Sequence, residues 1–139
     1  MPKSYFVDTG FLIALAAPRD QFHGKALRIA QGIRSESAVL ITTRAVLFEL
    51  GAALSGLRFR AGAAKMLSAM ETDPAFEITA VDDASYLEAV ALFEQHDDKE
   101  WSLTDCLSFV VMRARGLTDA LSADHHFEQA GFTAMLRDS

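Results

Sequence analysis

Four acidic residues in this sequence lie among apolar neighbours, which is unusual for an acid. Asp8 is flanked by Tyr-Phe-Val before it and Thr-Gly-Phe-Leu-Ile after it, and Glu49 lies in the otherwise apolar segment Val46–Leu54. Asp105 opens a mostly apolar segment, and Asp124 directly follows Ala-Leu-Ser-Ala. Carboxylates held in such places suit the binding of a divalent cation or acid–base chemistry.

Each of three acids also has a structural explanation, and the sequence leaves it open. Asp8 fits the N-cap of a following helix, and Asp124 fits the cap of a helix that begins at His125. Ser102 and Asp105 have the spacing of a capping box.

Glu49 is the hardest of the four to explain as a structural acid. The helix around it is apolar almost all round, so we expect it to be buried. The neighbours three and four residues away offer no cation; they are Ala45, Val46, Ala52 and Ala53. Burial of an unpaired carboxylate costs several kcal/mol. Glu49 therefore needs a partner, either a metal or catalytic site, which we favour, or a distant Arg or Lys.

The elements that must position these acids alternate along the chain. Strands are predicted at Ser4–Asp8, Ala38–Ile41, Phe76–Val81, Leu117–Ala123 and Phe132–Leu136. Helices are predicted at Phe22–Ile33, Ala45–Ser55, Arg60–Met70, from Asp82-Asp83 to about Gln95, at Ser102–Arg115 and at Asp124–Gly131, and an apolar turn at Phe11–Ala16. This alternation predicts an α/β fold with a mostly parallel sheet covered on both faces. Ligands of such sheets bind at the carboxyl ends of the strands.

Length and composition predict one packed domain over residues 1–139. Half of the residues are hydrophobic and 23% are charged, which suits a globular core. No apolar run approaches the ~20 residues of a membrane helix, and the first residues lack a signal-peptide pattern. The single cysteine, Cys106, excludes an internal disulfide. We expect a cytoplasmic protein without a membrane partner.

The charge balance limits how the protein can bind nucleic acid. The formal net charge is −6, so a polyanionic substrate needs bound cations or local basic residues. No glycine-rich phosphate loop and no serine hydrolase elbow is present. Zinc is not favoured by His125 and His126, because adjacent helix residues face different ways and no other ligand has suitable spacing. His23 and His96 are expected at the surface and Cys106 in the core.

The four acids, taken in order, resemble a PIN domain. The matching segments are Val7-Asp8-Thr9, Glu49 in its apolar helix, Ser102-Leu-Thr-Asp105, and Leu121-Ser-Ala-Asp124-His-His-Phe127. The chain is most similar to the VapC-like toxins of bacterial and archaeal toxin–antitoxin pairs, and the likeness covers essentially its whole length. It implies a three-layer α/β/α sandwich with a sheet of about five strands and ribonuclease activity dependent on Mg²⁺ or Mn²⁺.

The resemblance assigns roles to residues one position at a time. Asp8, Glu49, Asp105 and Asp124 become the catalytic, metal-binding acids. Thr9, Thr104 and Ser122 become hydroxyls that hydrogen-bond the acids or orient the substrate. The possible phosphate contacts are Arg44, Arg58 and Arg60, and the roles of Asp98 and Asp119 stay open.

The resemblance and the high apolar content together imply protein partners. We expect a homodimer and a small cognate antitoxin that places an apolar segment in a groove and offers a cation to the acids. Two alternatives remain open: a PIN-like interaction module without activity, and another Mg²⁺-dependent phosphoryl-transfer enzyme such as a phosphatase. The phosphatase class uses an aspartyl nucleophile with a nearby lysine, and no lysine lies beside the candidate acids in sequence.

Overall fold

A computed structural model describes residues 2–137, so the predicted domain of residues 1–139 extends past the described part at both ends. The strands are β1 (Ser4–Val7), β2 (Val39–Thr43), β3 (Phe76–Thr79), β4 (Asp119–Leu121) and β5 (Thr133–Ala134). The helices are α1 (Thr9–Ala16), α2 (His23–Glu36), α3 (Arg44–Ala53), α4 (Leu57–Thr72), α5 (Asp83–Gln95), α6 (Leu103–Arg115) and α7 (His125–Gln129).

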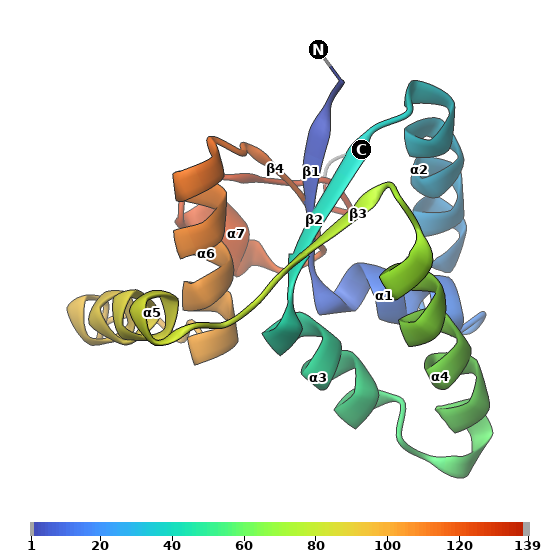
Figure 1. Ribbon diagram of the computed structural model, residues 1–139, viewed down its shortest axis with the longest axis horizontal. Helices are drawn as coiled ribbons and strands as arrows, with labels where there is room; N and C mark the ends of the chain where they lie inside the picture. The colour runs from blue at the N-terminus through green and yellow to red at the C-terminus, as the bar shows by residue number, and fades with distance from the viewer. Residues whose placement is uncertain (1, 138–139) are drawn as a thin grey trace.

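The strands form one sheet in the order β3-β2-β1-β4-β5, and every neighbouring pair is parallel. Figure 1 shows α1 to α4 on one side of the sheet and α6 on the other, with α5 packed outside α6. This arrangement confirms the predicted α/β/α sandwich and its parallel sheet of about five strands. Because all strands run the same way, their carboxyl ends meet at one edge, where loops and helix starts gather.

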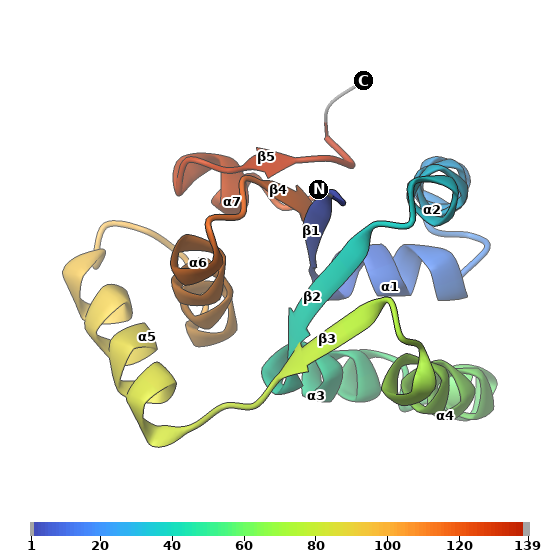
Figure 2. The ribbon, with the colours of Figure 1, turned by 45° about the horizontal axis from the view of Figure 1, so that its top comes forward.

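The core lies around the central strand β1, whose Phe6 and Val7 are fully buried. Aromatic rings continue it toward α6 and α7. The Phe109 ring of α6 lies edge-on to Phe127 of α7 at 5.0 Å, and Phe6 packs 6.2 Å from Phe127. These contacts fix the start of α7 against β1, which is what brings distant parts of the chain to the carboxyl edge. Figure 2 shows α7 beside β4 and β5.

Several predicted boundaries differ from the observed ones. The predicted turn Phe11–Ala16 is the second part of helix α1, which begins immediately after Asp8 and ends before Pro18. The last two strands are shorter than predicted. Strand β4 ends at Leu121, shortly before Asp124 caps α7, and β5 has only two residues. Helix α4 is longer than the predicted Arg60–Met70. No helix among residues 2–137 is both long and apolar enough to cross a bilayer.

Helix α3 is not buried all round, so that prediction is wrong. Its inner face carries the buried residues Val46, Leu47 and Leu50, whereas Phe48 is 80% exposed. Apolar composition therefore overstated the burial of this helix, because part of its apolar surface faces outward. The expectation that His23 and His96 lie at the surface holds only in part, since both side chains are partly buried. The His23 Nδ1 atom lies 2.7 Å from the carbonyl oxygen of Ala14.

Candidate active site

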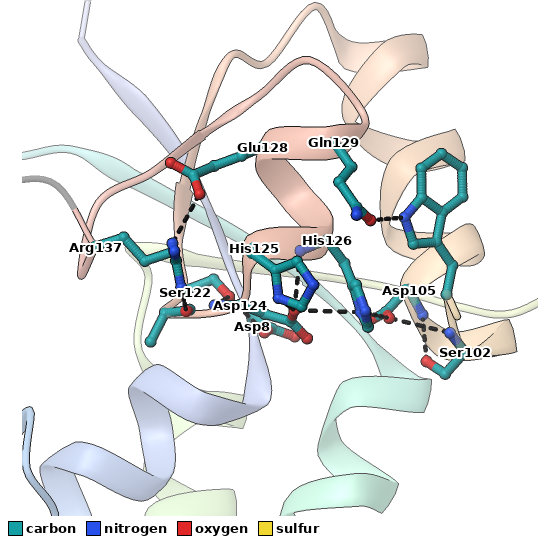
Figure 3. A network of polar contacts seen from close by, with 12 residues as sticks. Asp8, Ser102, Asp105, Ser122, Asp124, His125, His126, Glu128, Gln129 and Arg137 are labelled. Carbon is teal, nitrogen blue, oxygen red and sulfur yellow. Dashed lines mark hydrogen bonds and ion pairs between the residues drawn. The ribbon is translucent and has the colours of Figure 1, made fainter. Parts of the chain in front are cut away.

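The four predicted acids line one cavity at the carboxyl edge of the sheet. Asp8 joins β1 to α1, Asp124 joins β4 to α7, Asp105 lies in the first turn of α6, and Glu49 projects from α3. The cavity has a volume of about 550 Å³, and all four carboxylates contribute to its wall. Three of the acids, Asp8, Asp105 and Asp124, are seen together in Figure 3. The structure thus brings together residues that are up to 116 positions apart in the chain.

Asp8 and Asp105 are the two buried acids of the cavity, each 8% exposed. The Ser122 hydroxyl donates a hydrogen bond to the Oδ2 atom of Asp8 at 2.8 Å. Burial raises the pKa of the Asp8 carboxyl from 3.8 to about 7; hydrogen bonds from Ser122 and from the Thr9 backbone oppose this rise, and the charges of Asp105 and Glu49 add to it. The raised pKa shows that negative charge is costly here without a compensating cation.

Ser122 and Thr9 each hydrogen-bond one of the acids through a hydroxyl group. The Ser122 oxygen also accepts a hydrogen bond from the Asp124 backbone N–H at 3.0 Å, which connects the loops that carry Asp8 and Asp124. The Thr9 hydroxyl donates to Oε1 of Glu49 at 2.8 Å. Among residues 2–137, the ion pairs do not include Glu49. The alternative of a distant Arg or Lys partner for Glu49 is therefore not supported.

Asp105 has both of the properties that the sequence allowed. It forms the capping box with Ser102, because its Oδ2 accepts the Ser102 N–H and its own N–H donates to the Ser102 hydroxyl, each at 3.0 Å. The same Oδ2 lies 3.0 Å from Nδ1 of His126. A carboxylate at the start of α6 is also favoured by the helix dipole. The capping role fixes the position of Asp105 and leaves its carboxylate on the cavity wall.

His126 is the main residue that the sequence reasoning missed. Its Nδ1 lies between two of the acids, 3.0 Å from Asp105 and 3.2 Å from Asp124 (Figure 3). The two adjacent histidine rings also lie near each other, with centroids 4.5 Å apart, and ligand atoms of Asp124, His125 and His126 all lie within 4.8 Å. The premise that the two histidines face different ways is wrong, although His125 is exposed. The sequence signal was present in the run Asp-His-His-Phe.

Other candidates lie outside the acidic cavity. Thr104 lines a separate small pocket with Leu103 and Leu107. Asp119 begins β4, at the opposite end of the strand from Asp124, and Asp98 is exposed and pairs with Lys99 at 2.6 Å. None of these three residues lines the acidic cavity, although Thr104 directly precedes Asp105 in the chain.

The three predicted phosphate contacts lie on the far side of α3 and along α4. Arg44 forms an ion pair with Glu71 of α4. The Arg60 guanidinium donates to the carbonyl of Ser55, and Arg58 lies over the ring of Phe59. Among the described residues that line the acidic cavity, none is a lysine or an arginine.

The residues of the cavity fit a hard divalent cation. Carboxylate and hydroxyl oxygens are the ligands that Mg²⁺ and Mn²⁺ prefer, and a few carboxylates suffice because Mg²⁺ keeps several of its waters. The cavity gathers four carboxylates, and no lysine or arginine is among the described residues of its wall. The raised pKa of Asp8 reflects the cost of negative charge there, which such a cation would offset. Asp8, Glu49, Asp105 and Asp124 are the groups that would hold it.

The fold and the cavity define a protein with acids gathered at the carboxyl edge of a five-stranded parallel sheet. The chain belongs to the PIN domain family, whose model matches residues 5–133. Over 129 residues it is 33% identical to the 23S rRNA-specific endonuclease VapC20 of Mycobacterium tuberculosis. The aligned region covers 91% of this chain and 94% of VapC20.

Two solved structures are similar to this fold. The crystal structure of Mycobacterium tuberculosis VapC20, described as a sarcin–ricin loop cleaving toxin, has a TM-score of 0.82 at 32% identity and covers 93% of this chain and 96% of that one. FitAcB from Neisseria gonorrhoeae has a TM-score of 0.60 at 18% identity, covering 94% of each chain, and shows the fold alone.

Proposed function

We propose that this protein is a metal-dependent endoribonuclease that hydrolyses RNA phosphodiester bonds in its acidic cavity. The observation that carries the proposal is the convergence of Asp8, Glu49, Asp105 and Asp124 in one cavity of a PIN domain. Its relative VapC20 is named as an endonuclease specific for 23S rRNA. A structured loop of ribosomal RNA is therefore the first substrate to test.

The side chains of this chain divide the work between holding a cation and holding one another. Mg²⁺ or Mn²⁺, when bound, supplies an acidified water and stabilises the charge that develops on the phosphate. Asp8, Glu49, Asp105 and Asp124 provide the oxygen ligands. Ser122 fixes Asp8, Thr9 fixes Glu49, and His126 fixes Asp105 relative to Asp124. With the cation neutralising the acids, the phosphate can approach a cavity that otherwise repels it.

Substitution of one acid tests the proposal directly. Asp105→Asn keeps an acceptor for the Ser102 N–H and removes one charge, so we expect RNA cleavage with Mn²⁺ to fall at least about tenfold while far-UV circular dichroism stays native. Asp98→Asn is the matched control, because Asp98 is exposed and lies outside the cavity, and it should retain the parent rate.

Cleavage in excess EDTA at the rate seen with Mn²⁺ would contradict the metal-dependent mechanism. No cleavage of any RNA by the parent protein would favour the inactive interaction module. Release of phosphate from monoesters without RNA cleavage would favour the phosphatase alternative. That alternative has no support from the cavity itself, since no described lysine lines it.

We also propose that the protein is the toxin of a toxin–antitoxin pair that acts on RNA in the cytoplasm. An apolar groove of about 640 Å³ between α3 and α4 supports the antitoxin, since Leu47, Phe48 and Leu67 line it. Helix α3 separates this groove from the acidic cavity, to which it contributes Glu49. A segment in the groove therefore lies one helix away from the acids. Failure of the product of a neighbouring gene to co-purify would count against the pair.

A further inference from the structure

A second cavity lies directly beside the acidic one and is built differently. It has a volume of about 410 Å³, within the usual range of ~300–1,000 Å³ for ligand pockets. Its wall combines rings, namely Phe93, His96 and Trp101, with the polar residues Glu94, Asp97, Lys99 and Glu100 and with Cys106. The segment between α5 and α6 supplies most of these residues.

The two cavities share a wall. Glu100 lines both of them, Trp101 lines the second cavity, and the next residue, Ser102, lines the acidic one. In the first turn of α6, Asp105 faces the acidic cavity and Cys106 the second. Because the same short segments line both cavities, the two are neighbours, as a base and the next phosphate are along one RNA strand.

Aromatic rings make the second cavity suitable for a flat ligand. The His96 ring lines it and packs on Trp101 with centroids 4.7 Å apart. Trp101 is 5% exposed, its Nε1–H donates to Gln129 at 2.9 Å, and its ring lies edge-on to Phe109 at 5.0 Å. His96 is therefore backed by a ring that the core and a hydrogen bond hold in place.

The charges of the second cavity exclude a phosphate and admit a base. Three carboxylates line it, on Glu94, Asp97 and Glu100, against one lysine, Lys99, which already pairs with Asp98. A phosphate would be repelled there, whereas an uncharged base stacks on a ring and donates its amino group to a carboxylate. Uracil has no exocyclic amino group, and its one donor on that edge, N3–H, stands between two carbonyl oxygens that the carboxylates repel.

We propose that this second cavity is a nucleobase subsite, which takes the unstacked, amino-bearing base (adenine, guanine or cytosine) of a nucleotide next to the phosphate held at the acids. The base stacks on His96, and the carboxylates of Glu94 and Asp97 accept hydrogen bonds from its amino group. The assignment rests on the proposed ribonuclease function and adds to it a determinant of sequence preference.

Trp101 is the only tryptophan of the chain, so its fluorescence reports on this cavity. We expect guanosine, adenosine and cytidine, titrated into the protein in EDTA, to change Trp101 emission saturably, and uridine to bind at least several-fold more weakly. His96→Ala should weaken binding about tenfold, and His96→Phe should restore it. Leu57→Ala, at a 95% exposed side chain on α4 outside both cavities, is the control and should bind like the parent.

A double substitution tests the hydrogen bonds separately. Glu94→Ala with Asp97→Ala should retain stacking and lose the preference for amino-bearing bases over uridine. No saturable change with any nucleoside, equal binding of all four by the parent, or unchanged binding by His96→Ala would overturn the subsite. Since these titrations need no cleavage, RNA cleavage without nucleoside binding refutes the subsite alone, whereas nucleoside binding without cleavage refutes the ribonuclease alone.

Discussion

The buried Asp8 carboxyl makes the stability of the folded protein depend on pH. Burial holds its pKa at about 7, against 3.8 for the ordinary carboxyl. Between about pH 4 and pH 7 the folded protein keeps a proton that the unfolded chain releases, so unfolding becomes easier as the pH rises through this range. Without metal, the free energy of unfolding should fall by up to about 4 kcal/mol over the range and then level off.

Urea unfolding in EDTA across this pH range measures the effect. Asp8→Asn stays neutral at every pH, so its stability should vary less with pH than that of the parent. Parallel pH profiles of the two proteins would show that Asp8 is ionised in the fold and that its burial is compensated.

The same carboxyl links metal affinity to pH. A cation must displace the proton of Asp8 below about pH 7, so the apparent affinity for Mn²⁺ should rise by up to about tenfold per pH unit from about pH 5 to 7 and level off above. Calorimetric titration in two buffers of different ionisation enthalpy measures the released proton. An affinity independent of pH over this range would remove Asp8 from the ligands.

Glu49→Gln separates a metal ligand from a structural acid. The amide oxygen still accepts the Thr9 hydroxyl, and the charge near Asp8 disappears, so melting in EDTA should occur at the parent temperature or above it. Saturating Mn²⁺ should then raise the melting temperature of the variant less than that of the parent. A variant that melts far below the parent in EDTA, yet gains equally from Mn²⁺, would indicate a structural role.

At the scale of elements, the start of α6 combines a helix cap with the cavity wall. Ser102→Ala removes the acceptor for the Asp105 N–H, which should lower the free energy of unfolding by about 1 kcal/mol. It should also weaken Mn²⁺ binding, because Asp105 then loses part of its orientation. Chemical denaturation and Mn²⁺ titration measure the two effects.

Helix α5 provides the control for that substitution. Asp82 caps it through the Ser85 N–H in a second capping box, away from the acidic cavity. Asp82→Ala should therefore cost similar stability and leave Mn²⁺ affinity unchanged. Equal losses of Mn²⁺ affinity in both variants would mean that the effect follows stability in general and has no connection with Asp105.

At the scale of the whole molecule, exposed apolar side chains gather where α5 meets α6. Val81, Tyr86 and Leu103 are 40%, 49% and 37% exposed and line one small pocket, and Leu87, 62% exposed, follows Tyr86 on α5. Such a group supports the predicted homodimer, in which a symmetric interface would cover these residues. Sedimentation at micromolar concentration should show a dimer for the parent and a monomer for Leu87→Glu. Leu57→Glu, at a 95% exposed position on α4, should stay dimeric, and a monomeric parent would refute the interface.

The sequence by itself determined most helices and strands, and it placed Asp8 and Asp124 after strands and Asp105 at the start of a helix. Apolar periodicity located the strands and most helices, and the Ser102–Asp105 spacing gave a capping box that the structure confirms. These features depend on interactions between residues a few positions apart, which the sequence displays directly. Because the predicted strands are parallel, Asp8 and Asp124 had to meet at one edge.

Only the tertiary structure decided which side chains meet across the cavity. Thr9 binds Glu49 from 40 positions away, His126 bridges Asp105 and Asp124, and Arg44 is turned away toward Glu71. Burial of one face of α3, with Phe48 left outside, likewise depends on what packs against that helix. Such contacts arise between elements that are remote in sequence, and the side-chain directions are fixed only when these elements pack together. Periodicity and local spacing therefore cannot predict them.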